Sequence, residues 1–222
     1  MASTETSAED KKRRQVIVIL EQAALETVKT SKGFQLLNCD DHKGLHKKFN
    51  KDPSHSRPDI LHQELMAVLD SPLNKAGYLK IYIHTTKGVL VDVSSQMRVP
   101  RTYKRFAGLM VQLLHTLKIR STDGNQTLLS VIKNPVTKYL PANARKYALS
   151  RTGKLVNPWE WVETLPKDEP VVFIFGAMAH GHITKENTPY LDETFSLSEY
   201  PLSGAHAITR LLNAFERHWG IL

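Results

Sequence analysis

A stretch of the chain without acidic residues carries a group of cations. Between Ser94 and Thr122 there is no Asp or Glu, while six basic residues occur there: Arg98, Arg101, Lys104, Arg105, Lys118 and Arg120. On a helix beginning near Thr102, a single stripe would contain Arg101, Arg105, Gly108, Gln112 and His115. Guanidinium groups bind phosphate oxygens bidentately, so this stripe favours a contact with RNA, and the alternative is an ordinary solvated face.

A second candidate site is a run of small residues after an apolar strand. The segment Phe175-Gly176-Ala177-Met178-Ala179-His180-Gly181 follows the run that begins at Val171. Open α/β sheets bind ligands outside the carboxyl ends of their strands, and such a loop fits that position. The dinucleotide fingerprint and the phosphate-binding loop are both absent, which argues against dehydrogenases and NTPases. Tight packing is the alternative reading of the glycines.

Few residues in the sequence favour a metal site or a catalytic thiol. The pairs His42/His46 and His180/His182 lack a third ligand at a usual spacing, so we expect no metal site. Cys39 precedes His42 closely, but sequence neighbours seldom align as a catalytic pair, and a packed loop cysteine is the better interpretation.

Composition narrows the class of protein. The 222 residues carry 30 Lys+Arg against 22 Asp+Glu, a net charge of +8, which points to a polyanionic partner. A single cysteine excludes an internal disulfide and fits a reducing compartment. No apolar run reaches the ~20 residues of a membrane span, so we expect no membrane partner. Residues 1–14 are predicted to form a flexible tail. Its basic end, Lys11 to Arg14, is interpreted as a nuclear localisation signal, a phosphate contact or a solvated lead-in to a buried strand.

Strands and helices alternate along the chain, which predicts the α/β class with a mostly parallel sheet flanked by helices. The apolar runs Val16–Leu20 and Val171–Gly176 predict strands buried on both faces. The remaining expected elements are a hairpin (78–86 and 88–93), a short strand (147–150), a loop (38–51) and helices over 57–70, 102–117, 126–132, 159–165 and 203–219, the last capped by Ser203. No linker divides the chain.

Several blocks, in order, resemble the pseudouridine N-1-specific methyltransferases of small-subunit ribosomal RNA. The blocks are Asn38-Cys39-Asp40-Asp41-His42, Arg57-Pro58-Asp59-Ile60, Leu69-Asp70-Ser71-Pro72-Leu73-Asn74-Lys75-Ala76-Gly77, Arg98-Val99-Pro100-Arg101-Thr102-Tyr103-Lys104-Arg105-Phe106 and Tyr200-Pro201-Leu202-Ser203. The resemblance runs from about Gln15 to Leu222. It implies one SPOUT-type methyltransferase domain over 15–222, with a β-hairpin and RNA-binding elements at about 78–106. A C-terminal trefoil knot would hold S-adenosyl-L-methionine at about 147–222.

The resemblance also implies partners and location. It suggests a homodimer that methylates the N-1 atom of a pseudouridine in a single-stranded loop of small-subunit ribosomal RNA. The family acts in small-subunit biogenesis among pre-ribosomal assembly proteins, in the nucleus and nucleolus of eukaryotes. Two other classes stay open on the residues alone: a non-catalytic pre-ribosomal RNA-binding assembly factor, and a DNA or membrane-surface module that no motif supports beyond charge.

Site residues follow from the same resemblance. Cofactor contacts would fall on Leu149, Gly176, Gly181, His182, Ile183, Leu197, Ser198, Glu199, Tyr200, Pro201 and Leu202. RNA contacts would fall on Arg57, Arg98, Arg101 and Arg105, with Asp59 orienting Arg57. Asp70 is our candidate general base, because it is a carboxylate at a predicted helix end beside the Ser71-Pro72 turn. The local alternatives are a first-turn helix acid for Asp59 and a turn former for Asp70.

Overall fold

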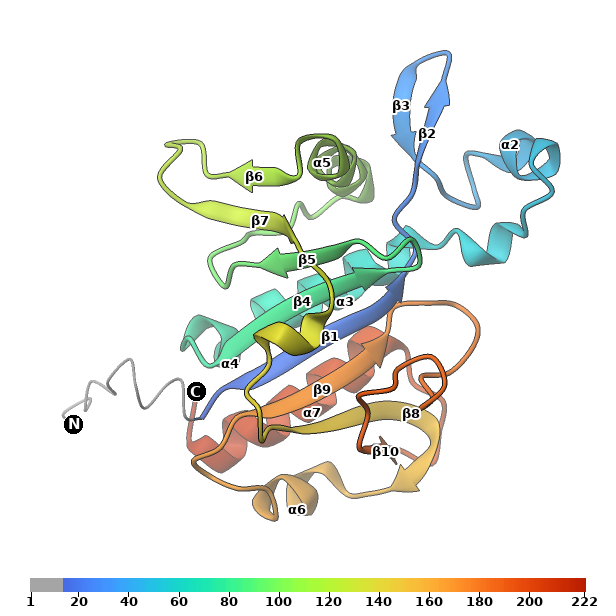
Figure 1. The fold of residues 1–222 in the computed structure, drawn as a ribbon. Coiled ribbons are helices and arrows are strands. Elements are labelled where there is room, and N and C mark those ends of the chain that lie inside the picture. The colour runs from blue at the N-terminus through green and yellow to red at the C-terminus, as the bar shows by residue number, and fades with distance from the viewer. Residues whose placement is uncertain (1–13) are drawn as a thin grey trace.

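A computed structural model describes residues 14–222 as one eight-stranded sheet flanked by helices, with a separate two-stranded hairpin (Figure 1). The strand order is β10-β8-β9-β1-β4-β5-β7-β6. The strands are β1 (Val16–Ala23), β2 (Thr27–Thr30), β3 (Gly33–Leu36), β4 (Leu79–Thr85), β5 (Leu90–Val93), β6 (Lys118–Arg120), β7 (Thr127–Ile132), β8 (Arg145–Leu155), β9 (Val171–Gly176) and β10 (Glu193–Ser196). The expected tail lies outside the described residues, except for Arg14, which pairs with Asp168 at 3.4 Å.

Several of the helices begin at a capping side chain or at a proline. The helices are α2 (Lys43–Lys48), α3 (Pro58–Asp70), α4 (Pro72–Lys75), α5 (Tyr103–Thr116), α6 (Pro158–Glu163) and α7 (Gly204–Trp219), with short 3-10 turns at Pro53–His55 and Val136–Tyr139. Pro58 and Pro72 open α3 and α4, where a missing amide hydrogen removes no helical bond. Ser203 caps α7 by accepting from the His206 amide, as expected, and Gly220 ends that helix in the left-handed conformation.

Strand β1 lies at the centre of the parallel half of the sheet. It pairs in parallel with β4 on one side and β9 on the other, so that Val18 lies between Ile81 and Phe173. The near-zero exposure of Val16 to Leu20 confirms the prediction that this strand is buried on both faces. Strands β8 and β10 extend the parallel order beyond β9.

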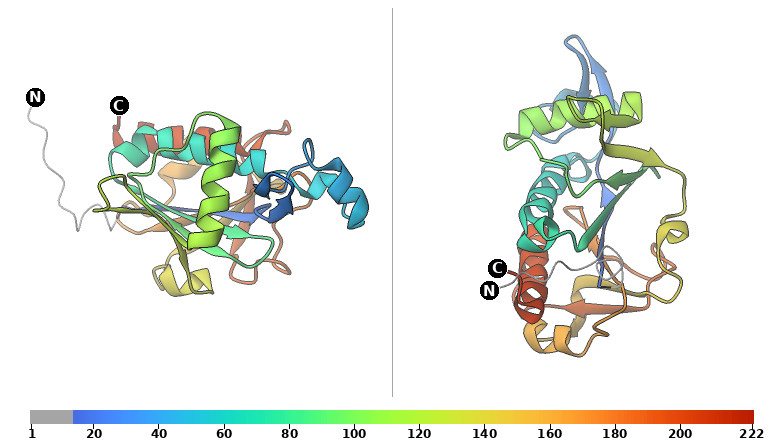
Figure 2. Two further views of the ribbon diagram at one scale, coloured as in Figure 1. Left: turned by 90° about the horizontal axis from the view of Figure 1, so that it is seen from above. Right: turned by 90° about the vertical axis from the view of Figure 1, so that its left-hand side faces the viewer.

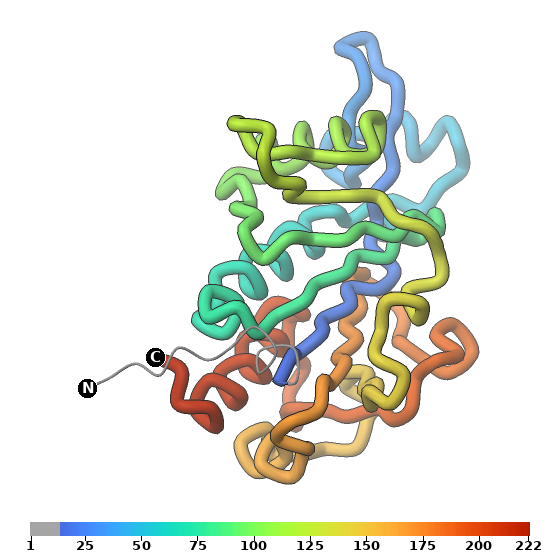
Figure 3. Tube along the Cα trace, turned by 60° about the vertical axis from the view of Figure 1, so that its left-hand side comes forward, coloured from blue at the N-terminus to red at the C-terminus, as the bar shows by residue number. Residues whose placement is uncertain are grey.

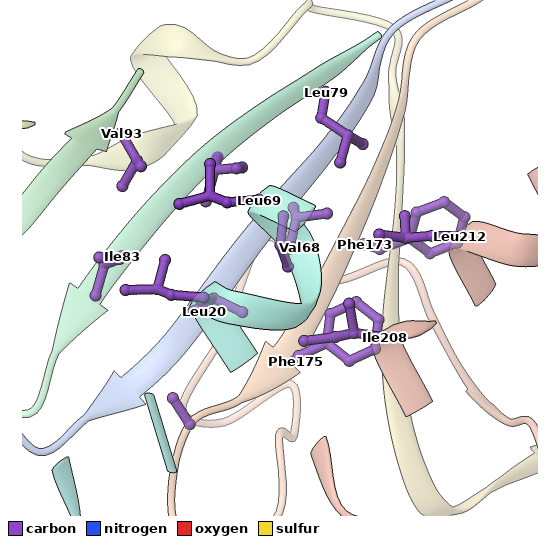
Figure 4. Packing of buried hydrophobic residues seen from close by; sticks show 14 of the residues in the cluster. Leu20, Val68, Leu69, Leu79, Ile83, Val93, Phe173, Phe175, Ile208 and Leu212 are labelled. Atoms are coloured by element: carbon purple, nitrogen blue, oxygen red, sulfur yellow. The ribbon is translucent and has the colours of Figure 1, made fainter. Parts of the chain in front are cut away.

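Helices α3 and α7 pack side by side on one face of this half (Figure 2). In Figure 4, Val68 and Leu69 of α3 and Ile208 of α7 point toward the strands. Phe173 and Phe175 meet them from β9. The opposite face carries a second apolar cluster to which the segments 133–144 and 177–192 contribute.

The other half of the sheet is antiparallel. Strands β4 and β5 form the expected hairpin, and β7 and β6 continue from β5. The helix expected over 126–132 is wrong, because this segment is β7. Three of its residues, Thr127, Val131 and Ile132, are β-branched, and the free edge of β5 offers a row of backbone partners that an isolated sequence pattern cannot reveal.

The segment between β1 and α3 forms an arm that stands beyond the sheet (Figure 3). It contains the antiparallel hairpin of β2 and β3, followed by α2. The hairpin was not expected, and the loop expected over 38–51 contains α2. Strand β3 packs against α5, so the arm is joined to the body of the protein along that helix.

Two buried glutamates have opposite surroundings. Glu21, at the carboxyl end of β1, accepts from the Tyr190 hydroxyl at 2.6 Å, and its other oxygen lies 2.8 Å from Nδ1 of His84. The bond from Tyr190 ties the segment 177–192 to the sheet, and the contact with His84 joins β1 to β4. The bond to Glu21 raises the pKa of His84, and burial beside Glu21 raises the pKa of Tyr190.

Glu64 is the opposite case. It lies on α3, fully buried against the first turn of α7, and among the described residues neither carboxyl oxygen has a hydrogen-bond partner. Its Oε1 occupies the space that a β-carbon on Gly204 would need, 1.9 Å from that position. Burial raises the pKa of Glu64 from an ordinary 4.5 to about 8. The carboxyl is therefore protonated in the folded protein at neutral pH.

This contrast predicts that replacing each glutamate by glutamine changes the free energy of unfolding in opposite directions. The unfolded chain ionises Glu64 above its ordinary pKa of 4.5, whereas the folded chain keeps the proton until about pH 8. The free energy of unfolding therefore falls as pH rises between these values. Glu64→Gln should remove that fall, so that the variant exceeds the parent in stability at pH 8 by a few kcal/mol and matches it near pH 4.5. Urea denaturation across this pH range measures the difference.

Glu21→Gln is the matched control. It breaks the charged contact with His84 and should destabilise the fold by about 1–3 kcal/mol near neutral pH. A Glu64→Gln variant with the same pH dependence as the parent would mean that the Glu64 carboxyl is ionised and solvated in the folded state.

Candidate active site

A cleft lies at the carboxyl end of β9, beside the middle of β8. Three segments form its walls: the loop after β9, the middle of β8, and the chain from β10 into the first turn of α7. Nine of the eleven residues expected to contact a cofactor line this cleft: Leu149, Gly176, Gly181, His182, Ile183, Leu197, Ser198, Tyr200 and Leu202. Segments that are far apart in the sequence, from Leu149 to Leu202, therefore meet at one site.

Two expected residues lie in the same segment without lining the cleft, namely Glu199 and Pro201, both of which are exposed. Eight further residues line it: Ser150, Arg151, Phe175, Met178, Phe195, Ser196, Gly204 and Ala207. The strand pattern could have indicated Phe175, which ends the buried run. Phe195 and Ser196 gave no signal, because β10 is a four-residue strand whose place beside β8 depends on tertiary pairing.

The C-terminal wall of the cleft is held by hydrogen bonds to its own backbone. The Ser196 hydroxyl donates to the Ser198 carbonyl at 2.9 Å, and the Tyr200 amide donates to the Ser198 hydroxyl at 3.0 Å. Nε of Arg210, on α7, donates to the Leu197 carbonyl at 3.1 Å. The ring of Tyr200 is 74% exposed at the edge of the cleft. This wall thus offers a preformed backbone and one free aromatic ring to a ligand.

The loop after β9 needs its second glycine for a conformational reason. Gly181 has a φ of +102°, a backbone geometry that side chains with a β-carbon rarely adopt. The loop starts from a fixed point, because the Ala177 amide donates to the Glu21 carbonyl at 2.8 Å. The walls combine apolar side chains and glycines with polar groups such as Arg151 and Ser198, a combination typical of sites for a nucleoside that carries a polar or charged group.

The four expected RNA-binding arginines lie outside the cleft. Arg57 precedes α3 and forms a two-bonded pair with Asp59, with nitrogen–oxygen distances of 2.8 and 2.7 Å. Arg98 lies in the loop before α5 and Arg105 lies on that helix, both exposed and without an ion pair to any described residue. Arg101, which is 70% exposed, holds the carboxylate of Asp70 with both terminal nitrogens.

Asp70 does not reach the cleft within one chain. It ends α3, and the following residues lead into the start of β4, at the amino edge of the parallel strands. The cleft lies at the carboxyl edge, where Arg57 begins α3. The 13 residues of α3 separate the two edges by ~20 Å. The carboxylate is instead occupied by Arg101, so within a single chain we assign Asp70 to positioning that arginine rather than to accepting a proton.

Cys39 and His42 do not form a catalytic pair. His42 faces the Asn38 amide and the Gln35 side chain, not the Cys39 thiol. Burial, helped by Asp40, raises the pKa of that thiol, which disfavours the nucleophilic thiolate. In the part of the chain from Arg14 onward, no cluster of three or more metal-binding side chains occurs. The same residues include no helix long and apolar enough to cross a membrane.

Known proteins resemble this chain over nearly its whole length. The family model described as EMG1/NEP1 methyltransferase matches residues 18–216. The chain is 51% identical to "Ribosomal RNA small subunit methyltransferase mra1" of Schizosaccharomyces pombe over 96% of its own length and 60% of the relative's. It is 49% identical to the Homo sapiens and 48% identical to the Drosophila melanogaster proteins named "Ribosomal RNA small subunit methyltransferase NEP1". Each of these two alignments covers 94% of this chain and 84% of the relative.

A solved structure has the same fold. The chain aligns with Archaeoglobus fulgidus Nep1 bound to S-adenosylhomocysteine with a TM-score of 0.70 at 23% sequence identity, covering 93% of this chain and 99% of the other. This likeness, with the parallel sheet flanked by helices, confirms the expected fold class. The family model and the relatives confirm the expected family and a methyltransferase activity. The chain therefore belongs to the EMG1/NEP1 methyltransferase family.

Proposed function

We propose that this protein methylates the N-1 atom of a pseudouridine in small-subunit ribosomal RNA, with S-adenosyl-L-methionine as the methyl donor. The observation that carries the proposal is the single cleft assembled from β8, the loop after β9 and the β10–α7 segment. Family membership supports the reaction, and the names of the relatives support the RNA class. The archaeal neighbour was solved with S-adenosylhomocysteine, the demethylated form of this donor.

The cleft suits such a cofactor. Its walls combine apolar side chains, including Leu149, Ile183 and Leu197, with the backbone of a glycine-containing loop. When bound, S-adenosylmethionine supplies an electrophilic methyl group on a sulfonium. The residues of the chain would hold the nucleoside and amino-acid parts, exclude water and leave one side open to the RNA base. No carboxylate lines the cleft among the described residues, so recognition would rest mainly on shape and backbone contacts.

The choice of base follows from bonding. In pseudouridine the ribose is attached through carbon, so N-1 carries a hydrogen and is free to react, whereas in uridine N-1 forms the glycosidic bond. The base must leave its stack to enter a protein cleft, which favours a single-stranded loop as the target. Exposed arginines such as Arg98 and Arg105 would hold the phosphates on either side, because guanidinium groups bind phosphate oxygens without reading the base.

The proposal extends to features that rest on the resemblance alone. We include a C-terminal trefoil knot around the cleft, a homodimer, and work beside pre-ribosomal assembly proteins in the nucleolus. A net charge of +8 suits an RNA-rich compartment but does not distinguish one such compartment from another.

A substrate comparison tests the reaction. Two RNA hairpins of identical sequence, one with pseudouridine and one with uridine at a single loop position, are incubated with the protein and methyl-labelled S-adenosylmethionine. We expect label only in the pseudouridine RNA, because only that base offers a free N-1. A Gly181→Ala variant, strained in the cleft loop, should lose labelling and cofactor affinity together. Equal labelling of both RNAs, or of neither, would refute the proposed specificity.

A second prediction concerns Asp70. Because its carboxylate holds Arg101, Asp70→Asn should raise KM for RNA roughly two- to fivefold, with kcat and its pH profile nearly unchanged. Arg101→Ala should raise the same KM further, with cofactor affinity intact. Asp92→Asn, which breaks the ion pair with Lys80 on the sheet, is the matched control and should leave KM unchanged.

The opposite outcome has a defined meaning. A large fall in kcat with a shifted pH profile would identify the Asp70 carboxylate as the general base after all. In that case the carboxylate would have to reach the cleft of a second copy of the chain, since ~20 Å of α3 separates it from the cleft of its own.

A further inference from the structure

A groove separates the arm from α5, away from the cofactor cleft. One wall is the β2–β3 hairpin with the residues that follow it, and the other is the N-terminal half of α5. The groove encloses about 1300 Å³, against about 190 Å³ for the cleft. Figure 3 shows the hairpin and α5 standing next to each other beyond the sheet. The groove therefore has room for several nucleotides.

Lysines face this groove from both walls. Lys29 and Lys32 lie on the hairpin and Lys104 lies on the first turn of α5. All three are exposed, and none forms an ion pair with a described residue. Among the residues that line the groove, Asp41 is the only acid, and its carboxylate accepts from the Asn38 side chain at 3.0 Å. The groove therefore carries a net positive charge that nothing within the described chain neutralises.

An aromatic ring lies on the same surface. Phe34, on the first half of β3, is 52% exposed, although an apolar ring of this size is usually buried. Its ring lies 4.5 Å from that of His115 on α5, nearly edge to face. Gly108 lies on the α5 wall, exposed, with no atom within 4 Å of where a β-carbon would lie. An open ring, a bare stretch of helix and flanking amines together make a stacking surface within a cationic groove.

We propose that this groove binds an unpaired RNA strand that flanks the methylated loop, with a base stacked on Phe34 and phosphates on Lys29, Lys32 and Lys104. Proteins that hold single strands combine a positive groove with exposed aromatic rings in this way. Arg105 lies one residue after Lys104 on α5, so the groove adjoins the arginine surface. The inference rests on the proposed function, because the strand is part of the same substrate.

Charge favours RNA over a protein segment as the occupant. Residues 27–51, which form most of the arm, contain six lysines and two aspartates. An acidic peptide would satisfy the amines, but its acidic side chains supply no flat ring to stack on the face of Phe34. Each nucleotide supplies both a phosphate and a π-face.

A binding experiment with matched variants tests the inference. Fluorescence anisotropy gives the affinity of the full chain for two RNAs: the pseudouridine hairpin alone, and the same hairpin with a ten-nucleotide single-stranded extension. Phe34→Ala should weaken binding of the extended RNA about tenfold and leave the hairpin unaffected. Phe49→Ala is the control, since Phe49 is also on the arm and 58% exposed but does not line the groove.

The lysines are tested in the same way. The double variant Lys29→Ala, Lys32→Ala should reduce the slope of log affinity against log salt for the extended RNA by about 1.4, which corresponds to two lost phosphate contacts to a single strand. The double variant Lys47→Ala, Lys48→Ala on α2, outside the groove, should change the slope far less. All variants should bind S-adenosylmethionine like the parent, which excludes misfolding as the cause.

The outcomes separate this inference from the proposed function. If the parent methylates the pseudouridine hairpin but Phe34→Ala binds the extended RNA normally, the groove inference is overturned and the proposed function stands. If Phe34→Ala and Phe49→Ala weaken RNA binding equally, the effect is not specific to the groove and the inference is overturned as well. If the parent neither binds nor methylates either RNA, both proposals fail.

Discussion

The parallel pairing of β1 with β4 and β9 is the constraint on which the rest of this structure depends. A strand with neighbours on both sides and apolar layers on both faces keeps its backbone groups paired and, from Val16 to Glu21, its side chains away from water. The same pairing aligns the carboxyl ends of the three strands at one edge. The arm begins at that edge, after β1, and the loop of the cleft begins there too, after β9. One set of backbone hydrogen bonds therefore positions both functional regions.

Two buried glutamates near this edge avoid an unpaired charge in different ways. Glu21 is satisfied by Tyr190 and His84 and thereby joins the cleft loop to the sheet. Glu64 has no partner among the described residues and stays protonated because burial disfavours its charged form. The first arrangement stabilises the fold through hydrogen bonds, whereas the second brings α3 directly against Gly204 and costs free energy once the pH rises above the ordinary pKa of the carboxyl.

The basic surplus of the chain is divided among separate surfaces. Arginines lie at both ends of α3 and on α5, while lysines gather on the arm. Two of the four arginines are held by carboxylates of the same chain, Arg57 by Asp59 and Arg101 by Asp70. Such pairs hold a guanidinium in one orientation and leave some of its donors for a phosphate. The first pair is local in sequence, whereas Arg101 and Asp70 are 31 residues apart and meet only in the folded chain.

The sequence by itself determined the α/β class, the buried strands β1 and β9, the boundaries of α3, α5 and α7 to within a few residues, and, through the family resemblance, most residues of the cleft. These features follow from local patterns of burial, capping and short motifs, which a single chain displays directly. Tertiary structure alone decided that 127–132 is a strand, that Asp70 faces Arg101 rather than the cleft, and that the arm and α5 form a groove. The physical reason is common to all three: each depends on a partner far away in the chain, whether the free edge of β5, the guanidinium of Arg101 or a helix seventy residues beyond Phe34.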